Sequence, residues 1–131
     1  MSWVARYVVA LLVLGIGDAL WLSYFAHAVF RPTLGTILLD DPRWLAVGLF
    51  YLAYPVGVLI FAVSPALRAG SAWMAIIYGA LFGLFAYGTY DATNFATIKA
   101  WTVQLATMDT AWGVMLTALS AVAGYLVSMR G

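Results

Sequence analysis

The sequence predicts an all-α integral membrane protein, a four-helix bundle that forms a single transmembrane domain over residues 1–131. Two properties of the composition carry this prediction, since 66% of the residues are hydrophobic and only 8% are charged. Water-soluble domains carry about a quarter charged residues, so the chain falls outside their range. The third observation is that the apolar residues gather in four long stretches rather than spreading evenly along the chain.

Each apolar stretch is close to or above the roughly 20 residues that a helix needs to cross the hydrocarbon layer. The stretches cover about residues 4–30, 44–63, 72–97 and 105–129. Backbone N–H and C=O groups find no water in lipid, so spans of this length are expected to be helices. The alternation of a β-barrel strand is not seen. Short connections place both termini on one side, here named side A, opposite side B.

The first stretch also imitates a secretory signal peptide, since Arg6 precedes an apolar run that ends in Ala-His-Ala at residues 26–28. The run is too long for such a peptide and holds Asp18 at its centre, so we expect a retained membrane helix. Residues 31–41 follow, and their apolar positions predict a short helix along the membrane interface.

The other stretches carry signals of bending and close packing. Pro55 lies midway through the second stretch, where it removes a hydrogen bond to the carbonyl of Tyr51 and is expected to kink the helix. Small residues recur every four positions in the third and fourth stretches, a spacing that lets membrane helices approach closely. They are Ala75, Gly79 and Gly83 in the third stretch and Gly113, Thr117 and Ala121 in the fourth.

The basic residues do not indicate an orientation in the membrane. Each side carries three of them, so the positive-inside rule gives no preference. They are Arg6, Arg68 and Arg130 on side A and Arg31, Arg43 and Lys99 on side B. Such a balance is expected of a protein that inserts both ways up, and it also arises by chance among six basic residues. Four helices enclose little volume, so we expect at least a homodimer, in which oppositely oriented copies can pair.

Three of the five acidic residues lie inside the predicted spans, at Asp18, Asp91 and Asp109. A carboxylate at a lipid-facing helix centre costs about 2.5–3.5 kcal/mol, so all three are expected to face the interior of the bundle. Helices one and three run towards side B and helix four starts there, which places all three acids in the side-B half. With no Lys or Arg deep inside a span, we expect at least one acid to be protonated at neutral pH.

Aromatic and polar residues recur beside these acids. Tyr87 and Asn94 share a stripe of the third helix with Asp91, which we therefore expect to be the central acid. A tryptophan follows an aspartate by three positions in both the first and the fourth helix. These residue types predict a cavity for a proton or a small ligand, with acids for proton exchange and aromatic faces for cation–π contact. Its predicted lining is Asp18, Trp21, Tyr51, Tyr54, Tyr87, Asp91, Asn94, Asp109 and Trp112.

No feature of the sequence indicates a catalytic centre. The chain has no cysteine and a single histidine, so we expect no metal site and no cysteine nucleophile. It has no nucleotide motif, and we expect no cofactor and no catalytic residue. The net charge of +1 without a basic run gives no reason to expect nucleic acid as a partner.

Three classes of function remain open on these residues. The first is the binding or transport of a small cationic or lipid-like ligand, with the lipid bilayer as surroundings. The second is an accessory role in the modification of fatty-acyl chains. The third is a structural or assembly subunit, in which the acids only join helices through Tyr, Trp or Asn. The first class is favoured, because acids inside a membrane usually mark functional sites.

Four segments resemble those of an uncharacterised bacterial family of membrane proteins, catalogued as domain of unknown function 2177. The segments are residues 18–22, 50–54, 79–97 and 109–113. The most specific part is Thr-Tyr-Asp-x-Thr-Asn at residues 89–94, whereas Ala92 and Thr102 depart from the family's usual Leu and frequent Pro. The resemblance covers nearly the whole chain and implies a four-helix protein of the bacterial inner membrane. Family members are often encoded near lipid-modifying proteins, which keeps the second class of function open.

Overall fold

The four predicted spans are helices, which confirms the predicted fold class. The computed structural model describes residues 3–39 and 41–130, and every regular element in this part of the chain is helical. Four continuous helical segments are long and apolar enough to cross a membrane. They are Trp3–Leu34, Trp44–Ala69, Ala72–Thr97 and Val103–Ser128. Asp40, which falls within the predicted interfacial helix, and the side chain of Arg130, which was expected on side A, lie outside the described residues.

The first two segments are each built from three consecutive elements. The first contains α1 (Trp3–Phe25), the π-helical turn η1 (Ala26–Phe30) and α2 (Arg31–Leu34). The second contains α3 (Trp44–Val58), the π-helical turn η2 (Leu59–Val63) and α4 (Ser64–Ala69). The third and fourth segments are the single helices α5 (Ala72–Thr97) and α6 (Val103–Arg130).

Both composite segments run beyond the predicted ranges because a π-helical turn precedes a proline in each. The N–H of Arg31 bonds to the carbonyl of Ala26, five residues back, and the N–H of Ser64 bonds in the same way to Leu59. A proline directly follows each of these donors. In an α-helix the proline ring would press on the carbonyl four residues back, and the wider turn relieves this contact. The helices therefore continue past their prolines.

The connection between the first two segments differs from the predicted interfacial helix over residues 31–41. Only Arg31–Leu34 is helical, and it continues the first segment instead of forming an element of its own. Leu34 is buried against the bundle, whereas the apolar residues 37–39 are exposed. The apolar side chains therefore do not share one helical face.

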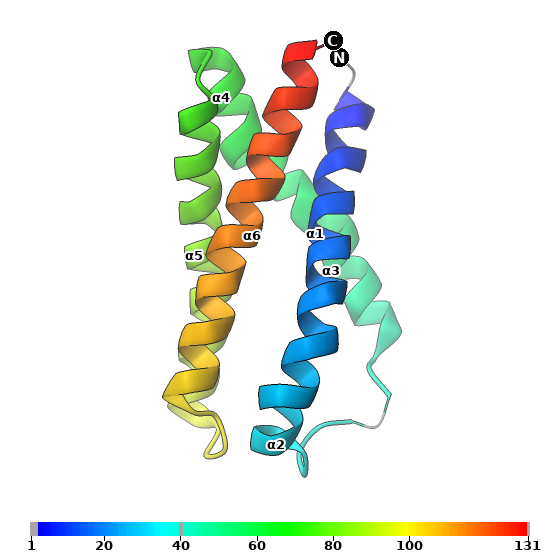
Figure 1. Ribbon diagram of the computed structural model, residues 1–131, viewed down its shortest axis with the longest axis vertical. Helices are drawn as coiled ribbons and strands as arrows, with labels where there is room; N and C mark the ends of the chain where they lie inside the picture. Colours follow the sequence, from blue (N-terminus) through cyan, green and yellow to red (C-terminus); the bar gives the residue numbers. More distant parts are fainter. Residues whose placement is uncertain (1–2, 40, 131) are drawn as a thin grey trace.

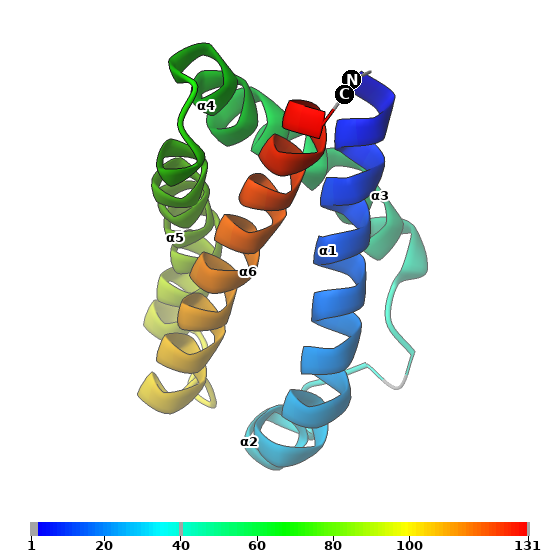
Figure 2. The ribbon, with the colours of Figure 1, turned by 45° about the horizontal axis from the view of Figure 1, so that its top comes forward.

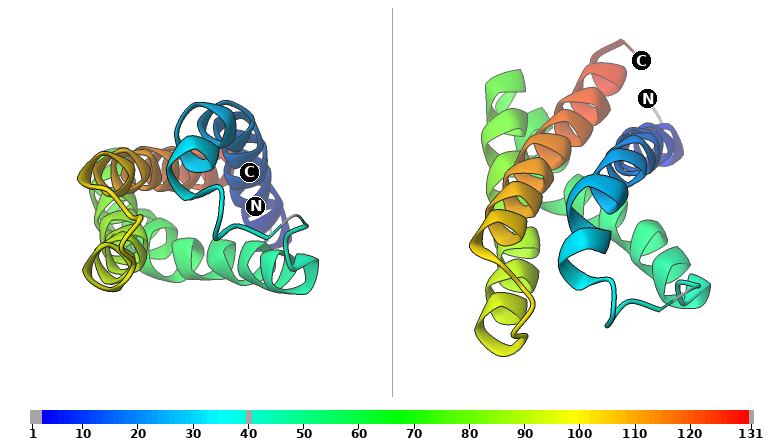
Figure 3. Two further views of the ribbon diagram at one scale, coloured as in Figure 1. Left: turned by 90° about the horizontal axis from the view of Figure 1, so that it is seen from below. Right: turned by 60° about the horizontal axis from the view of Figure 1, so that its bottom comes forward.

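The helices form one bundle with an oblique member. In Figure 1, α5 and α6 lie side by side and α1 runs along the other side of α6. The segment from α3 to α4 crosses behind these helices at an angle, which the view from below shows as a separate side of the bundle (Figure 3). The start of α1 and the end of α6 lie at the same end of the molecule, side A (Figure 1). Towards side B, α1 diverges from α5 and α6 (Figure 2).

The small residues identified in the sequence bring α5 and α6 into backbone contact. A Cβ atom at Gly79 would lie 3.0 Å from the Cα of Ala118 and from the carbonyl oxygen of Thr117. A Cβ atom at Gly83 would press in the same way on the carbonyl of Gly113. Larger residues at either glycine would push the two helices apart, so the spacing serves packing within one bundle.

Two apolar clusters form the interior. The larger one lies towards side A and includes Leu14, Val58, Leu59, Val63 and Leu116, and the smaller one lies towards side B and includes Phe25, Val29, Leu34, Trp101 and Leu105. Tyr87 and Trp112 pack against the larger cluster, whereas Trp21 packs against the smaller one. The predicted site residues therefore lie where the two clusters meet.

Candidate functional site: a buried aspartate cluster

Asp18 is the point at which all four membrane-spanning segments meet. Its side chain, on α1, is only 6% exposed. The hydroxyl groups of Tyr51 on α3 and Tyr87 on α5 both donate to Oδ2, the latter over 3.3 Å. The indole N–H of Trp112 on α6 donates to Oδ1 over 3.0 Å. One carboxyl group thus receives a hydrogen bond from each of the other three segments.

The hydrogen-bond partners of the Asp18 carboxyl group are all neutral. Tyrosine hydroxyl and indole N–H groups are donors without charge, and three of them together suit an ionised carboxylate, which can only accept. The six basic residues of the chain all lie at or near helix ends or in connections. The site therefore surrounds a buried carboxyl group with neutral donors from three other segments.

Gly113 allows Tyr87 to reach Asp18. A Cβ atom at Gly113 would overlap the ring of Tyr87, so the ring lies directly over the backbone of α6 at this glycine. Gly17, which directly precedes the acid on α1, gives similar room to the side chain of Leu116. Two glycines thus shape the approach of the neighbouring helices to Asp18. Neither was among the predicted site residues, although Gly113 belongs to the small-residue spacing.

Trp21 and Trp112 stack on each other next to Asp18. Their ring centroids are 4.7 Å apart and their planes differ by 8°. Trp21 also stacks on Phe25, one turn further along α1, with centroids 4.7 Å apart. Trp112 binds the acid through its N–H group, whereas the Nε1 atom of Trp21 is buried and has no hydrogen-bond partner among the described residues. Trp21 therefore contributes an aromatic face rather than a hydrogen bond to Asp18.

Tyr54 contacts Asp18 only through another tyrosine. Its hydroxyl group shares a 2.8 Å hydrogen bond with the hydroxyl group of Thr117. Its ring meets the ring of Tyr87 edge to face, with centroids 6.0 Å apart. Thr117 is a residue that the predicted lining missed, since only its place in the small-residue spacing was visible in the sequence.

Asp91 and Asp109 form a second acidic pair, between α5 and α6. They are 1% and 8% exposed, and their carboxyl groups lie within hydrogen-bonding reach of each other. Thr110 donates its hydroxyl hydrogen to Asp91 Oδ2 over 2.8 Å. The other oxygen, Asp91 Oδ1, is buried and receives no donor from the described residues. Thr110 was not predicted, although its position next to Asp109 was a usable signal.

The expected stripe around Asp91 is only partly realised. Tyr87 donates to Asp18 and not to Asp91, and the Asn94 side chain lies within hydrogen-bonding reach of the Tyr90 hydroxyl group. Asp91 is oriented instead by a residue of the neighbouring helix. Helical phase placed these residues on one face of α5, but it does not determine which partner each one meets across the interface.

The acidic pair lies one helical turn from Asp18, towards side B. Asp91 follows Tyr87 by four residues on α5, and Asp109 precedes Trp112 by three residues on α6. Since the two helices are antiparallel, both steps lead in the same direction, by about 4.5–6 Å at 1.5 Å per residue. Asp109 is close enough to Asp18 for their charges to interact. The three acids form one cluster with two parts, which are Asp18 with its three donors and the pair of Asp91 and Asp109.

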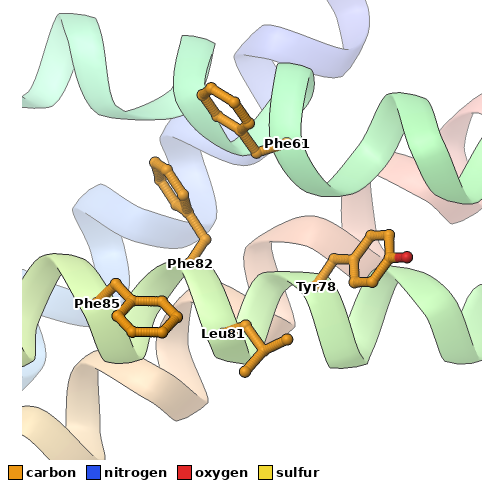
Figure 4. A pocket seen from close by; sticks show the side chains of 5 residues that line it. All are labelled: Phe61, Tyr78, Leu81, Phe82 and Phe85. Atoms are coloured by element: carbon orange, nitrogen blue, oxygen red, sulfur yellow. The ribbon is translucent and has the colours of Figure 1, made fainter.

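Two cavities lie beside the cluster. One, of about 350 Å³, opens on the outer face of α5 and η2 and is lined by Phe61, Tyr78, Leu81, Phe82 and Phe85 (Figure 4). Another, of about 270 Å³, lies near side B and is lined by residues of η1, α2 and the following connection, with Arg31 among them. None of the nine predicted site residues lines either cavity.

The fold and the buried acids define a small, multi-pass integral membrane protein with a polar cluster inside its four helices. The chain belongs to the family described as "Predicted membrane protein (DUF2177)", whose model matches residues 3–126. This match confirms the resemblance inferred from the sequence. No curated protein and no solved structure matches the chain.

Proposed function

We propose that this protein binds small cations with large apolar surfaces and carries them across the membrane. The proposal rests on one observation: Asp18, a carboxyl group buried in the bundle, is surrounded by neutral donors and by aromatic rings. A buried negative charge without a basic partner attracts a cation, and aromatic faces bind the same kind of ligand through cation–π contact. The bacterial inner membrane is the proposed location.

A continuous series of aromatic rings supports access from the lipid. Phe61 stacks on Phe82 with centroids 5.6 Å apart, and Phe82 lies 5.2 Å from Tyr54. Tyr54 meets Tyr87 at 6.0 Å, and Tyr87 donates to Asp18. The series therefore leads from the outer surface of the bundle to the buried acid in four rings.

The outer end of this series is a cleft suited to an apolar ligand. The cavity of about 350 Å³ lies at Phe61 and Phe82, and Phe85 beside it is 70% exposed (Figure 4). The ring of Phe82 lies against Gly57 of α3, where a Cβ atom would come within 2.7 Å of it. A lipophilic cation would first occupy this aromatic cleft and then reach Asp18 as the rings of the series rotate.

Binding of tetraphenylphosphonium to the purified protein in lipid nanodiscs tests this proposal. Tetraphenylborate, an anion of the same shape, controls for hydrophobic adsorption. We expect the cation to bind and Asp18→Asn to weaken its binding at least tenfold, because the amide removes the charge and keeps the shape. Asp41→Asn, in an exposed connection, is the matched control and should bind like the wild type. Equal binding of the two probes, or full binding by Asp18→Asn, contradicts the proposal.

The aromatic route has its own test. Phe82→Ala removes a ring that belongs to both the cleft and the series, and we expect a severalfold slower binding of tetraphenylphosphonium. Phe95→Ala is the control, since Phe95 is a half-exposed residue of the same helix and lines neither cavity. Equal rates for the two variants would mean that the ligand does not enter through the cleft.

A further inference from the structure

The carboxyl groups of Asp91 and Asp109 need a hydrogen-bond donor between them, and a proton on one of them supplies it. Asp91 Oδ1 is buried and receives no donor from the part of the chain that the structure describes, and the Asp109 carboxyl group lies within hydrogen-bonding reach of the same side chain. An ionised carboxylate has no hydrogen to donate, so two ionised groups would face each other as acceptors only. If one of them carries a proton, it becomes the missing donor.

We propose that Asp91 and Asp109 share a single proton at neutral pH, and that this is the proton a cation bound at Asp18 displaces. The first part stands on the geometry of the pair, and the second rests on the proposed function. When the cation binds, its positive charge offsets a second negative charge in the cluster, and the shared proton leaves to water. One positive charge enters and one leaves, so the net charge of the bundle interior is unchanged.

The position of the pair suits this exchange. Thr110 holds one oxygen of Asp91 at 2.8 Å, which leaves the other oxygen for the shared proton. Asp109 is 8% exposed, and the pair lies on the side-B flank of Asp18, nearer to that end of the bundle. The pair is coupled to Asp18 by charge and by position, one turn away on both α5 and α6.

Other titratable groups face the pair and have to be separated from it in the experiment. They are Asp18 from α1, Tyr51 from α3, and Tyr87 and Tyr90 from α5. The tyrosines carry no carboxyl group, so an infrared spectrum distinguishes them from the acids. Asp18 is distinguished by its own variant, Asp18→Asn.

Infrared spectroscopy of the ligand-free protein tests the shared proton. We expect the C=O band of one protonated carboxyl group at neutral pH, retained in Asp18→Asn and lost in Asp109→Asn. In the latter variant the amide N–H₂ group donates permanently to Asp91, so the fold is expected to survive. A spectrum without this band overturns the proposal, as does a band that persists in Asp109→Asn and disappears in Asp18→Asn.

Proton release on addition of tetraphenylphosphonium in weakly buffered solution tests the exchange. We expect about one proton per bound cation in the wild type and in Asp41→Asn, and almost none in Asp109→Asn even though the cation still binds. Release that is undiminished in Asp109→Asn overturns the proposal and leaves the proposed function standing. If tetraphenylphosphonium does not bind at all, the exchange is refuted with the proposed function, and the infrared band still decides whether the pair shares a proton.

Discussion

Trp112 and Asp18 join the last helix of the bundle to the first, with the indole N–H 3.0 Å from Asp18 Oδ1. Each of the two residues belongs to an Asp-x-x-Trp sequence, and the hydrogen bond runs between these sequences rather than within either of them. The tryptophan that follows Asp18 on its own helix stacks on Trp112 instead. The two sequences therefore interlock, so that α1 and α6 are held by a hydrogen bond and a ring stack at one level.

Two replacements of Asp18 should distinguish the effect of losing its charge from the effect of losing its hydrogen-bond acceptor. Asp18→Asn keeps an oxygen for Trp112 and offers N–H₂ to tyrosine hydroxyl groups, which can accept, so we expect a change in unfolding free energy below about 1 kcal/mol. Asp18→Leu leaves three donors unpartnered and should cost about 2–4 kcal/mol. Unfolding in mixed micelles, followed by circular dichroism, measures both. Equal stability of the two variants would show that the hydrogen bonds contribute little.

The contact between Gly113 and Tyr87 can be measured by a double-mutant cycle. We expect Gly113→Ala to destabilise the wild type by about 1–3 kcal/mol, because the new methyl group overlaps the ring of Tyr87. In a Tyr87→Ala background the overlap is gone, and the same change should be nearly neutral. Gly15→Ala is the control, since nothing lies within 4 Å of a Cβ atom there. A cost that is equal in both backgrounds would place the strain elsewhere.

The stack of Trp21 and Trp112 should be visible in solution. Two indole rings 4.7 Å apart and nearly parallel couple their electronic transitions, which gives a pair of circular dichroism bands of opposite sign. We expect Trp21→Phe to remove most of this signal, because one of the two coupled indoles is lost. Trp73→Phe should leave it intact, since Trp73 is 68% exposed on α5. A couplet that survives Trp21→Phe would assign the signal to other rings.

The sequence predicts the depth of the site residues in the membrane, but not which of them contact each other across a helix interface. Depth in the membrane follows from 1.5 Å per residue along a helix, so Asp18, Asp91 and Asp109 were correctly expected at neighbouring levels. Which residue meets which across an interface depends on helix rotation and crossing angle, and no single helix encodes these. For this reason the sequence did not predict that Thr110, rather than Asn94, orients Asp91. Likewise, the π-helical turns arise from a local conflict at the prolines, which hydropathy does not register.

The basic residues are divided equally between the two sides of the membrane, so they favour neither orientation. By their positions along the helices, Arg6, Arg68 and Arg130 lie towards side A, and Arg31, Arg43 and Lys99 lie towards side B. We expect reporter fusions at the C-terminus to detect both orientations, and two additional lysines at one end to select one of them. If oppositely oriented copies pair in a homodimer, variants fixed in opposite orientations should restore activity only together. A wild type found in one orientation would refute dual insertion.

Because all four membrane-spanning segments meet at Asp18, the order in which they are synthesised affects the insertion of the first helix. The three donors to Asp18 follow it in the chain by 33, 69 and 94 residues. During synthesis the first helix is therefore offered to the lipid with an unsatisfied acid at its centre, at a cost of about 2.5–3.5 kcal/mol until its partners arrive. The last of these partners is on the final helix. The first helix is thus stably inserted in the membrane only near the end of translation. In a nascent chain arrested before residue 112, the first helix should be accessible to extraction and proteolysis.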